Sequence, residues 1–292
     1  MGSNHANSQI PCSVSSARQY SVHDVPFRMR LVPTSSLISG DNGDPSPIDT
    51  GLWIGETQVT YELWYMVCQW ALGRSYRFGL PGMEGSGQIG ELHLGKAPTA
   101  ARKQPVTMVR WIDCTLWCNA LSEFLGCDPL YTSNGMPLKD SMSRQFSVDS
   151  VQKTAVGFRL PLSDEWVYAA RYIDGSRWTP KDYASGAGAP SDDHEATNSV
   201  AWYDANSGDT THNVGEKRAN ALGLYDMSGN VGEWCSDWQP GRNSSERIIR
   251  GGDYFSASTL LEVGRSISLR GDLASRYVGF RIAMQGSYEF QG

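Results

Sequence analysis

Residues 222–237, LGLYDMSGNVGEWCSD, decide the fold of this chain because they place Gly229 and Gly232, with the carboxylates Asp226 and Glu233, among large apolar side chains. Glycines at the spacing of Gly229 and Gly232 indicate positive φ angles or a close approach of the backbone. We therefore expect a tightly turned, buried loop in this segment and neither a helix nor a strand. A buried turn directs carbonyl oxygens inward, and carbonyls beside Asp226 and Glu233 suit a hard cation.

Several long motifs carry a resemblance to a known family, and they occur in one order along the chain. They are ETQVTYELW (56–64), PVTMVRWIDCTLWCNALSEFLG (105–126), FRLPLSDEWVYAAR (158–171), GLYDMSGNVGEW (223–234), RGGDY (250–254) and VGFRIA (278–283). Together they resemble the formylglycine-generating-enzyme family, also called the sulfatase-modifying-factor family, a branch of the C-type-lectin fold. The resemblance covers roughly residues 50 to 283. It implies an α+β, C-type-lectin-like fold with much irregular structure.

The motifs are spread too evenly to divide the chain of 292 residues, so we expect a single domain over residues 25–292. Residues 1–24 are polar and are expected to be a flexible segment or an expression-tag remnant in place of a native leader. Aromatic residues make up 11% of the chain, beside 31 glycines and 14 prolines, which is typical of an irregular fold with an aromatic core.

Apolar periodicity predicts two main helices. One is capped by Thr60 and runs to Leu72, and the other spans residues 113–125. A third helix is expected after Ser163 as N-cap, ending near Tyr172. Residues 25–54 predict a strand, a loop and a second strand, whereas residues 174–221 form a long polar connection.

Charge and composition exclude some functions. A net charge of −6 argues against a nucleic-acid partner. The sequence contains no run of eighteen apolar residues, the length needed to span a membrane. Six cysteines are too few for a disulfide scaffold in a chain of this length, and none forms a C-x-x-C zinc pair.

The family resemblance implies a structural calcium ion held by Asp226, by the carbonyls of Gly229 and Val231, and by the carboxylate of Glu233. The alternative is that both carboxylates accept hydrogen bonds from buried amides in the turn. The usual V-W-E-W of the family is V-G-E-W here, so Gly232 removes a large side chain beside the expected site.

The resemblance also argues against the oxidase activity of the family. Formylglycine-generating enzymes place two copper-binding cysteines six and eleven residues after the arginine of RGGDY. This chain has Ser256 and Leu261 there, and neither supplies the thiolate that copper(I) selects. The chain has no G-x-S-x-G, H-E-x-x-H or P-loop motif. We expect no copper and no catalysis; a copper oxidase acting on cysteine is the alternative.

Residues 250–283 alternate glycines and arginines with small, apolar and aromatic residues. This segment resembles the variable region of diversity-generating-retroelement variable proteins, C-type-lectin folds that include spirochaete surface lipoproteins. The resemblance implies a changeable ligand-binding face on a rigid frame, the ordinary alternative being a lectin-fold core and loop without this role. The candidate variable residues are Asp253, Phe255, Ser256, Ser258, Thr259, Leu260, Ser266, Ser268, Leu269, Asp272, Leu273, Ser275 and Tyr277.

The expected function is therefore non-enzymatic ligand binding of the receptor or adhesin kind. The expected partner is a protein or glycan surface, because the candidate residues are spread along a strand and loops. Neither E-P-N nor Q-P-D is present, which disfavours calcium-dependent sugar binding. We expect a monomer at the cell surface or outer membrane, held by a lipid anchor in the native precursor.

Overall fold

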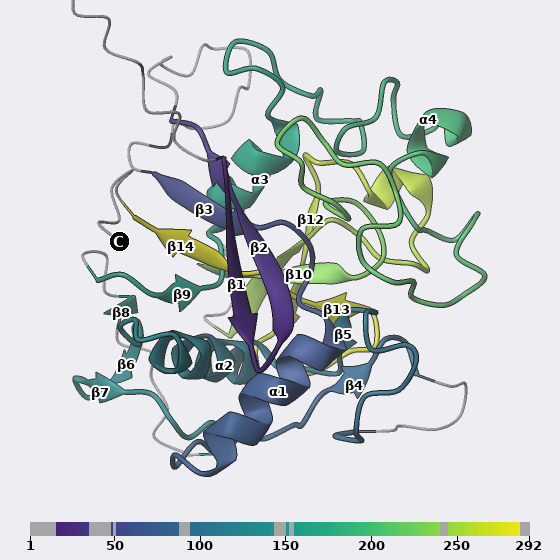
Figure 1. Ribbon diagram of the computed structural model, residues 1–292. Helices are drawn as coiled ribbons and strands as arrows, with labels where there is room; N and C mark the ends of the chain where they lie inside the picture. Colours follow the sequence, from purple (N-terminus) through teal and green to yellow (C-terminus); the bar gives the residue numbers. More distant parts are fainter. Residues whose placement is uncertain are drawn as a thin grey trace, which may run out of the picture.

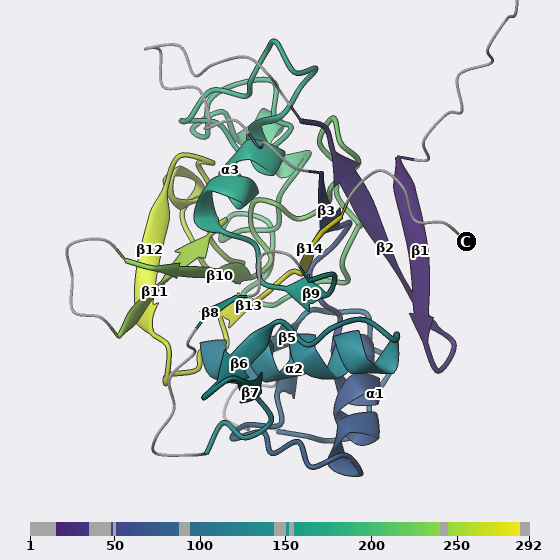
Figure 2. The same cartoon turned by 90° about the vertical axis from the view of Figure 1, so that its left-hand side faces the viewer.

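Two β-sheets form the frame of the fold (Figures 1 and 2). The computed structural model describes residues 16–34, 48, 51–87, 94–142, 150–151, 155–239 and 245–286. The five-stranded sheet has the order β1-β2-β3-β14-β9, with strands Ala17–Val22 (β1), Val25–Val32 (β2), Leu52–Gly55 (β3), Phe158–Arg159 (β9) and Ala283–Gln285 (β14). The four-stranded sheet has the order β12-β11-β10-β13, with strands Gly232–Trp238 (β10), Glu246–Arg250 (β11), Ser266–Arg270 (β12) and Val278–Gly279 (β13).

The remaining strands form two small sheets. One pairs β4 with β5, and the other has the order β7-β6-β8. Their strands are Met83–Glu84 (β4), Val106–Thr107 (β5), Tyr131–Ser133 (β6), Met136–Pro137 (β7) and Ser150–Val151 (β8). This mixture of short strands, few helices and long connections confirms the predicted α+β, C-type-lectin-like architecture.

The two main helices lie where the apolar periodicity predicted them. Helix α1 is Tyr61–Leu72, and the Thr60 hydroxyl caps it by accepting a hydrogen bond from the Leu63 amide at 3.3 Å. Helix α2 is Trp111–Phe124 and begins two residues before the expected Asp113. The helices pack through Trp64 and Trp117, whose rings stack with centroids 5.9 Å apart, and both side chains are fully buried.

The third helix was predicted with the wrong cap. Helix α3 is Ser163–Arg171, so Ser163 is its first residue and Leu162 is the N-cap. The Glu165 carboxylate accepts a hydrogen bond from the Leu162 amide at 2.8 Å, and this satisfies the helix start. The Ser163 hydroxyl instead accepts a hydrogen bond from Arg250 Nη2 at 2.7 Å. The 174–221 connection contains one short helix, α4 (His194–Asn198). A 3-10 turn, η1 (Ser258–Leu260), lies after β11.

The expectation that residues 1–24 are a flexible segment was wrong for the end of that range. Ala17–Val22 form β1, which pairs with β2 along its full length. His23 and Asp24 both have positive φ angles, 44° and 68°, as a two-residue hairpin turn requires. The sequence did not reveal this turn because neither residue is the usual glycine.

The prediction for residues 222–237 was right for the first part and wrong for the last. The chain turns tightly up to Val231, with positive φ angles at Asp226, Gly229 and Asn230. From Gly232 it becomes β10, which pairs with β11 and runs parallel to β13. A Cβ at Gly232 would lie 2.9 Å from the Ile249 side chain, so this glycine permits close packing between strands.

Candidate functional site

An ion pair lies at the centre of the molecule, where the two sheets and the 222–231 loop meet. Glu233 on β10 accepts hydrogen bonds from Arg281 Nε at 2.6 Å and from Arg281 Nη2 at 2.7 Å, and both side chains are 0% exposed. The Trp166 indole donates to the same carboxylate at 2.6 Å. Arg281 also donates to the carbonyls of Gly55 and Tyr225. One guanidinium therefore neutralises Glu233 and joins β3 to the loop.

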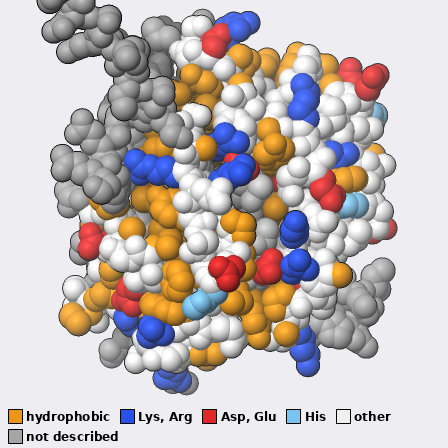
Figure 3. Space-filling model, in the orientation of Figure 1, with side chains coloured by type: hydrophobic (Ala, Val, Ile, Leu, Met, Phe, Trp, Pro, Cys, Tyr) orange, Lys and Arg blue, Asp and Glu red, His pale blue; other side chains and the backbone are white. Residues whose placement is uncertain are grey.

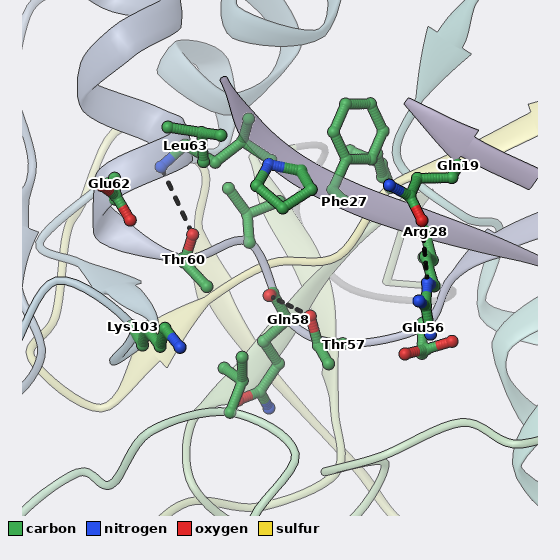
Figure 4. Close-up of a pocket in the computed structure, with 16 residues that line it drawn as sticks. Gln19, Phe27, Arg28, Glu56, Thr57, Gln58, Thr60, Glu62, Leu63 and Lys103 are labelled. Atoms are coloured by element: carbon green, nitrogen blue, oxygen red, sulfur yellow. Dashed lines mark hydrogen bonds between the residues drawn. The ribbon is translucent and has the colours of Figure 1, made fainter. Parts of the chain in front are cut away.

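The four groups predicted to hold calcium do converge on one point, and a side chain lies at that point. Gln58 Nε2, with its two N–H groups, lies within hydrogen-bond distance of the carbonyls of Asp226 at 3.1 Å, Gly229 at 3.3 Å and Val231 at 2.8 Å, and of Glu233 Oε1 at 3.0 Å. Gln58 itself is 1% exposed. Figure 4 shows its side chain pointing away from Phe27 and Leu63, although all three residues border the same cavity.

The residues of this site do not fit a calcium ion while Gln58 keeps this position. A calcium ion is surrounded by six to eight oxygens at about 2.3–2.6 Å. The position that such an ion would occupy here is filled by the amide nitrogen of Gln58. The negative charge of Glu233 is already neutralised by its ion pair with Arg281. Within the described ranges, no group of three or more His, Cys, Asp or Glu side chains is placed to hold a metal ion. Calcium at Asp226, Gly229, Val231 and Glu233 stays a prediction that the fit disfavours.

The candidate variable residues lie in three successive segments. They are the turn around η1, the strand β12, and the connection that leads to β13. The exposed ones are Phe255, Thr259, Leu260, Ser266, Asp272 and Leu273, and the partly exposed ones are Asp253, Ser258, Ser268, Leu269, Ser275 and Tyr277. Strand β12 is an edge of its sheet and lies on the outside of the molecule in Figure 2. Most of the predicted residues are therefore available to a partner.

Ser256 is the exception, because its side chain is buried. Its hydroxyl accepts a hydrogen bond from the Asp253 amide at 3.1 Å, while the Asp253 carboxylate accepts one from the Phe255 amide at 2.9 Å. Burial raises the pKa of Asp253, although the hydrogen bond from the Phe255 amide to its carboxylate partly opposes the rise. Ser256 and Asp253 thus fix the turn that presents Phe255.

Aromatic rings join the first and third segments. The ring of Phe255 lies 5.9 Å from that of Tyr277, which in turn lies 5.3 Å from the buried Tyr254. Phe255 is 56% exposed, so a large apolar side chain faces solvent on a buried aromatic support. Rings held in this way lose little conformational freedom when they bind a partner.

The sequence analysis missed exposed apolar residues beside the predicted set. Ile267 is 52% exposed between Ser266 and Ser268 on β12, and Trp238 is 50% exposed at the end of β10. The alternation of small and apolar residues along β12 could have revealed Ile267.

The position of Trp238 depends on pairing across the sheet. Its register partner is Arg247, whose own partner on β12 is the candidate residue Leu269. The Arg247 guanidinium lies 3.1 Å from the Trp238 ring centroid and 3.5 Å from that of Trp111. Burial lowers the pKa of Arg247 to about 9, and the two indole faces stabilise its charged form.

A sequence model of the sulfatase-modifying factor enzyme 1-like domain matches residues 42–285. The chain belongs to this family. It is 31% identical over 185 residues to the chaperone protein LppX of Paenibacillus barcinonensis, a match that covers 55% of this chain and 62% of the relative. It is 32% identical over 161 residues to the formylglycine-generating enzyme of Streptomyces coelicolor, covering 44% of this chain and 46% of that enzyme. The chain thus spans less than two thirds of these curated relatives.

Among solved structures, the variable protein 1 of Treponema denticola is similar over almost its whole length. The TM-score is 0.68 with 28% sequence identity, and the match covers 92% of this chain and 99% of that protein. This similarity confirms the resemblance inferred from residues 250–283 and places the chain beside a variable protein within the sulfatase-modifying-factor family.

The two positions expected to bind copper in an active member of this family carry no thiol here. Leu261 is fully buried and packs in a small cluster with Val200 and Tyr203, and Ser256 supports the turn described above. Burial raises the pKa of the Cys114 and Cys235 thiols, which disfavours the reactive thiolate. The absence of copper stays a prediction, and the geometry around Leu261 supports it.

No helix in the described part of the chain is both long and apolar enough to cross a bilayer.

Proposed function

We propose that this chain is a non-enzymatic binding protein of the receptor or adhesin kind, whose binding face is formed by residues 253–277. One observation carries the proposal: the exposed Phe255 ring packs on the partly exposed Tyr277, which in turn packs on the buried Tyr254, at the start of an exposed edge segment. The similarity to variable protein 1 over 92% of the chain supports the same conclusion.

The shape of this face favours a macromolecular partner. The exposed residues follow η1, the edge strand β12 and a turn, and they do not converge on a cavity. A cavity of about 330 Å³ does exist, but it lies between the β1–β2 hairpin and the start of α1 (Figure 4). The net charge of −6 favours a protein or glycan over a nucleic acid. Figure 3 shows the side of the β1–β2 hairpin, where acidic and basic side chains are also interspersed.

We further propose that a diversity-generating retroelement varies this face, and that the native precursor is lipid-anchored at the cell surface or outer membrane. Sequencing the coding neighbourhood tests the first point. We expect a near-copy of the 3′ end that differs chiefly at adenines, beside a reverse-transcriptase gene. Metabolic labelling of the native precursor with a fatty-acid analogue tests the second, and an unlabelled surface protein would contradict the anchor.

The binding face predicts a localised loss of affinity. Replacing Phe255, Leu269 and Tyr277 together by serine should weaken binding by at least about thirtyfold, since a buried aromatic anchor contributes about 2 kcal/mol or more. The measurement is titration of the purified protein against the strongest hits of a glycan array and a protein array. Leu72→Ser is the matched control, because Leu72 is 62% exposed on α1, outside the proposed face. Equal affinity of the triple variant and the control would contradict the proposal.

The alternative copper oxidase predicts a different result. With copper(I), oxygen and a cysteine-containing peptide, we expect no oxygen uptake above the rate without protein, because Ser256 and Leu261 offer no thiolate. An oxygen electrode measures the consumption of oxygen, and mass spectrometry of the peptide measures the conversion of its cysteine. Oxygen uptake together with conversion of the peptide cysteine would establish the oxidase.

A further inference from the structure

We propose that the Gln58 carboxamide takes the position of the structural cation in this fold, so that the central loop is held without calcium. The inference rests on contacts of the buried loop and is independent of the binding face. Gln58 Nε2 lies within 3.3 Å of four oxygens, three from backbone carbonyls and one from Glu233. A set of inward oxygens needs a positive or hydrogen-bond-donating group at its centre.

The four oxygens also fix the orientation of the amide. A carboxamide has two N–H donors on its nitrogen and only lone pairs on its oxygen. Rotating the group by half a turn would place Gln58 Oε1 against the carbonyls of Asp226, Gly229 and Val231 and against Glu233, without a proton between them. In the orientation observed, Nε2 lies closest to Val231 and Glu233, at 2.8 Å and 3.0 Å. The nitrogen therefore serves the loop as a donor.

Arg281 supplies the charge that an amide cannot. It holds Glu233 through two hydrogen bonds, one to each carboxylate oxygen, so the carboxylate is neutralised by Arg281 and not by the neutral Gln58. The remaining atoms are acceptors: within the described residues, Gln58 Oε1 and Asp226 Oδ1 are buried without a hydrogen-bond partner. A carboxylate in place of the amide would thus add negative charge to a site already rich in acceptors. Such a site would require a cation.

Calcium itself is the probe in a direct experiment. The melting temperature of the wild-type protein should be the same in calcium chloride, in magnesium chloride and in a chelator, and elemental analysis after desalting should find no calcium. Gln58→Glu should melt lower in chelator and recover by about 5 °C when calcium is at a hundred times its dissociation constant. Titration calorimetry should then give one calcium per chain for this variant.

Gln58→Met is the matched control, because it keeps the size of the side chain and removes the donor. It should melt lower than wild type and show no response to calcium. If Gln58→Glu does not fold, the wild-type protein and Gln58→Met still decide the matter. Calcium that raises the wild-type melting temperature, or that stays bound at one equivalent, overturns the proposal. So does a folded Gln58→Glu that is indifferent to calcium.

Discussion

Replacing Arg281 by methionine is expected to destabilise the protein by about 3–5 kcal/mol, because it leaves the buried Glu233 carboxylate without its cation. Both partners are 0% exposed, so water cannot solvate the charge that remains. The carbonyls of Gly55 and Tyr225 would lose a donor as well. Urea unfolding followed by tryptophan fluorescence measures the loss.

Two further variants show whether the effect comes from the buried charge. Arg270→Met removes an arginine from an ion pair whose members are 58% and 57% exposed, and it should leave the free energy of unfolding almost unchanged because solvent screens the pair. Adding Glu233→Gln to Arg281→Met should restore part of the loss, since the unpaired charge is then gone. A loss for Arg281→Met no larger than that for Arg270→Met would refute the central role of this ion pair.

Gly229→Ala should cost about 3 kcal/mol or more, because two penalties coincide there. Gly229 has a φ of 79°, and a Cβ would lie 2.2 Å from the Trp202 carbonyl oxygen, so the backbone of one segment must move. Gly126→Ala isolates the first penalty. Gly126 has a φ of 72°, yet nothing lies within 4 Å of an added Cβ, and we expect a cost of about 1–2 kcal/mol. Equal losses in thermal unfolding would mean that the contact with Trp202 relaxes freely.

Local sequence patterns predicted the parts of the fold that depend on local interactions. The helical spacing of apolar residues predicted α1 and α2. The order of the motifs indicated the family, which the match over residues 42–285 confirms. The hairpin between β1 and β2 was missed because His23 and Asp24 adopt positive φ without a glycine. The start of β10 was missed because its partners β11 and β13 lie later in the chain.

The candidate sites divide in the same way. The inward oxygens of the 226–233 segment were foreseen from glycines and carboxylates, but the group that satisfies them comes from Gln58, which precedes Asp226 by 168 positions. Nothing within either segment indicates that contact. Among the candidate variable residues, exposure was foreseen for most, whereas Ser256 is buried by a turn whose geometry depends on Asp253.

Strand β14 has a consequence for how the chain is made. It lies between β3 and β9 in the interior of the first sheet, although it is the last strand of the described chain, and Arg281 stands just before it. The early strands cannot complete their sheet until residues after the 253–277 segment have left the ribosome. A frameshift or premature stop within that segment would delete both the ion pair and the interior strand. Folding thus acts as a reading-frame check, because only chains read in frame through residues 253–277 can form the ion pair and the complete sheet.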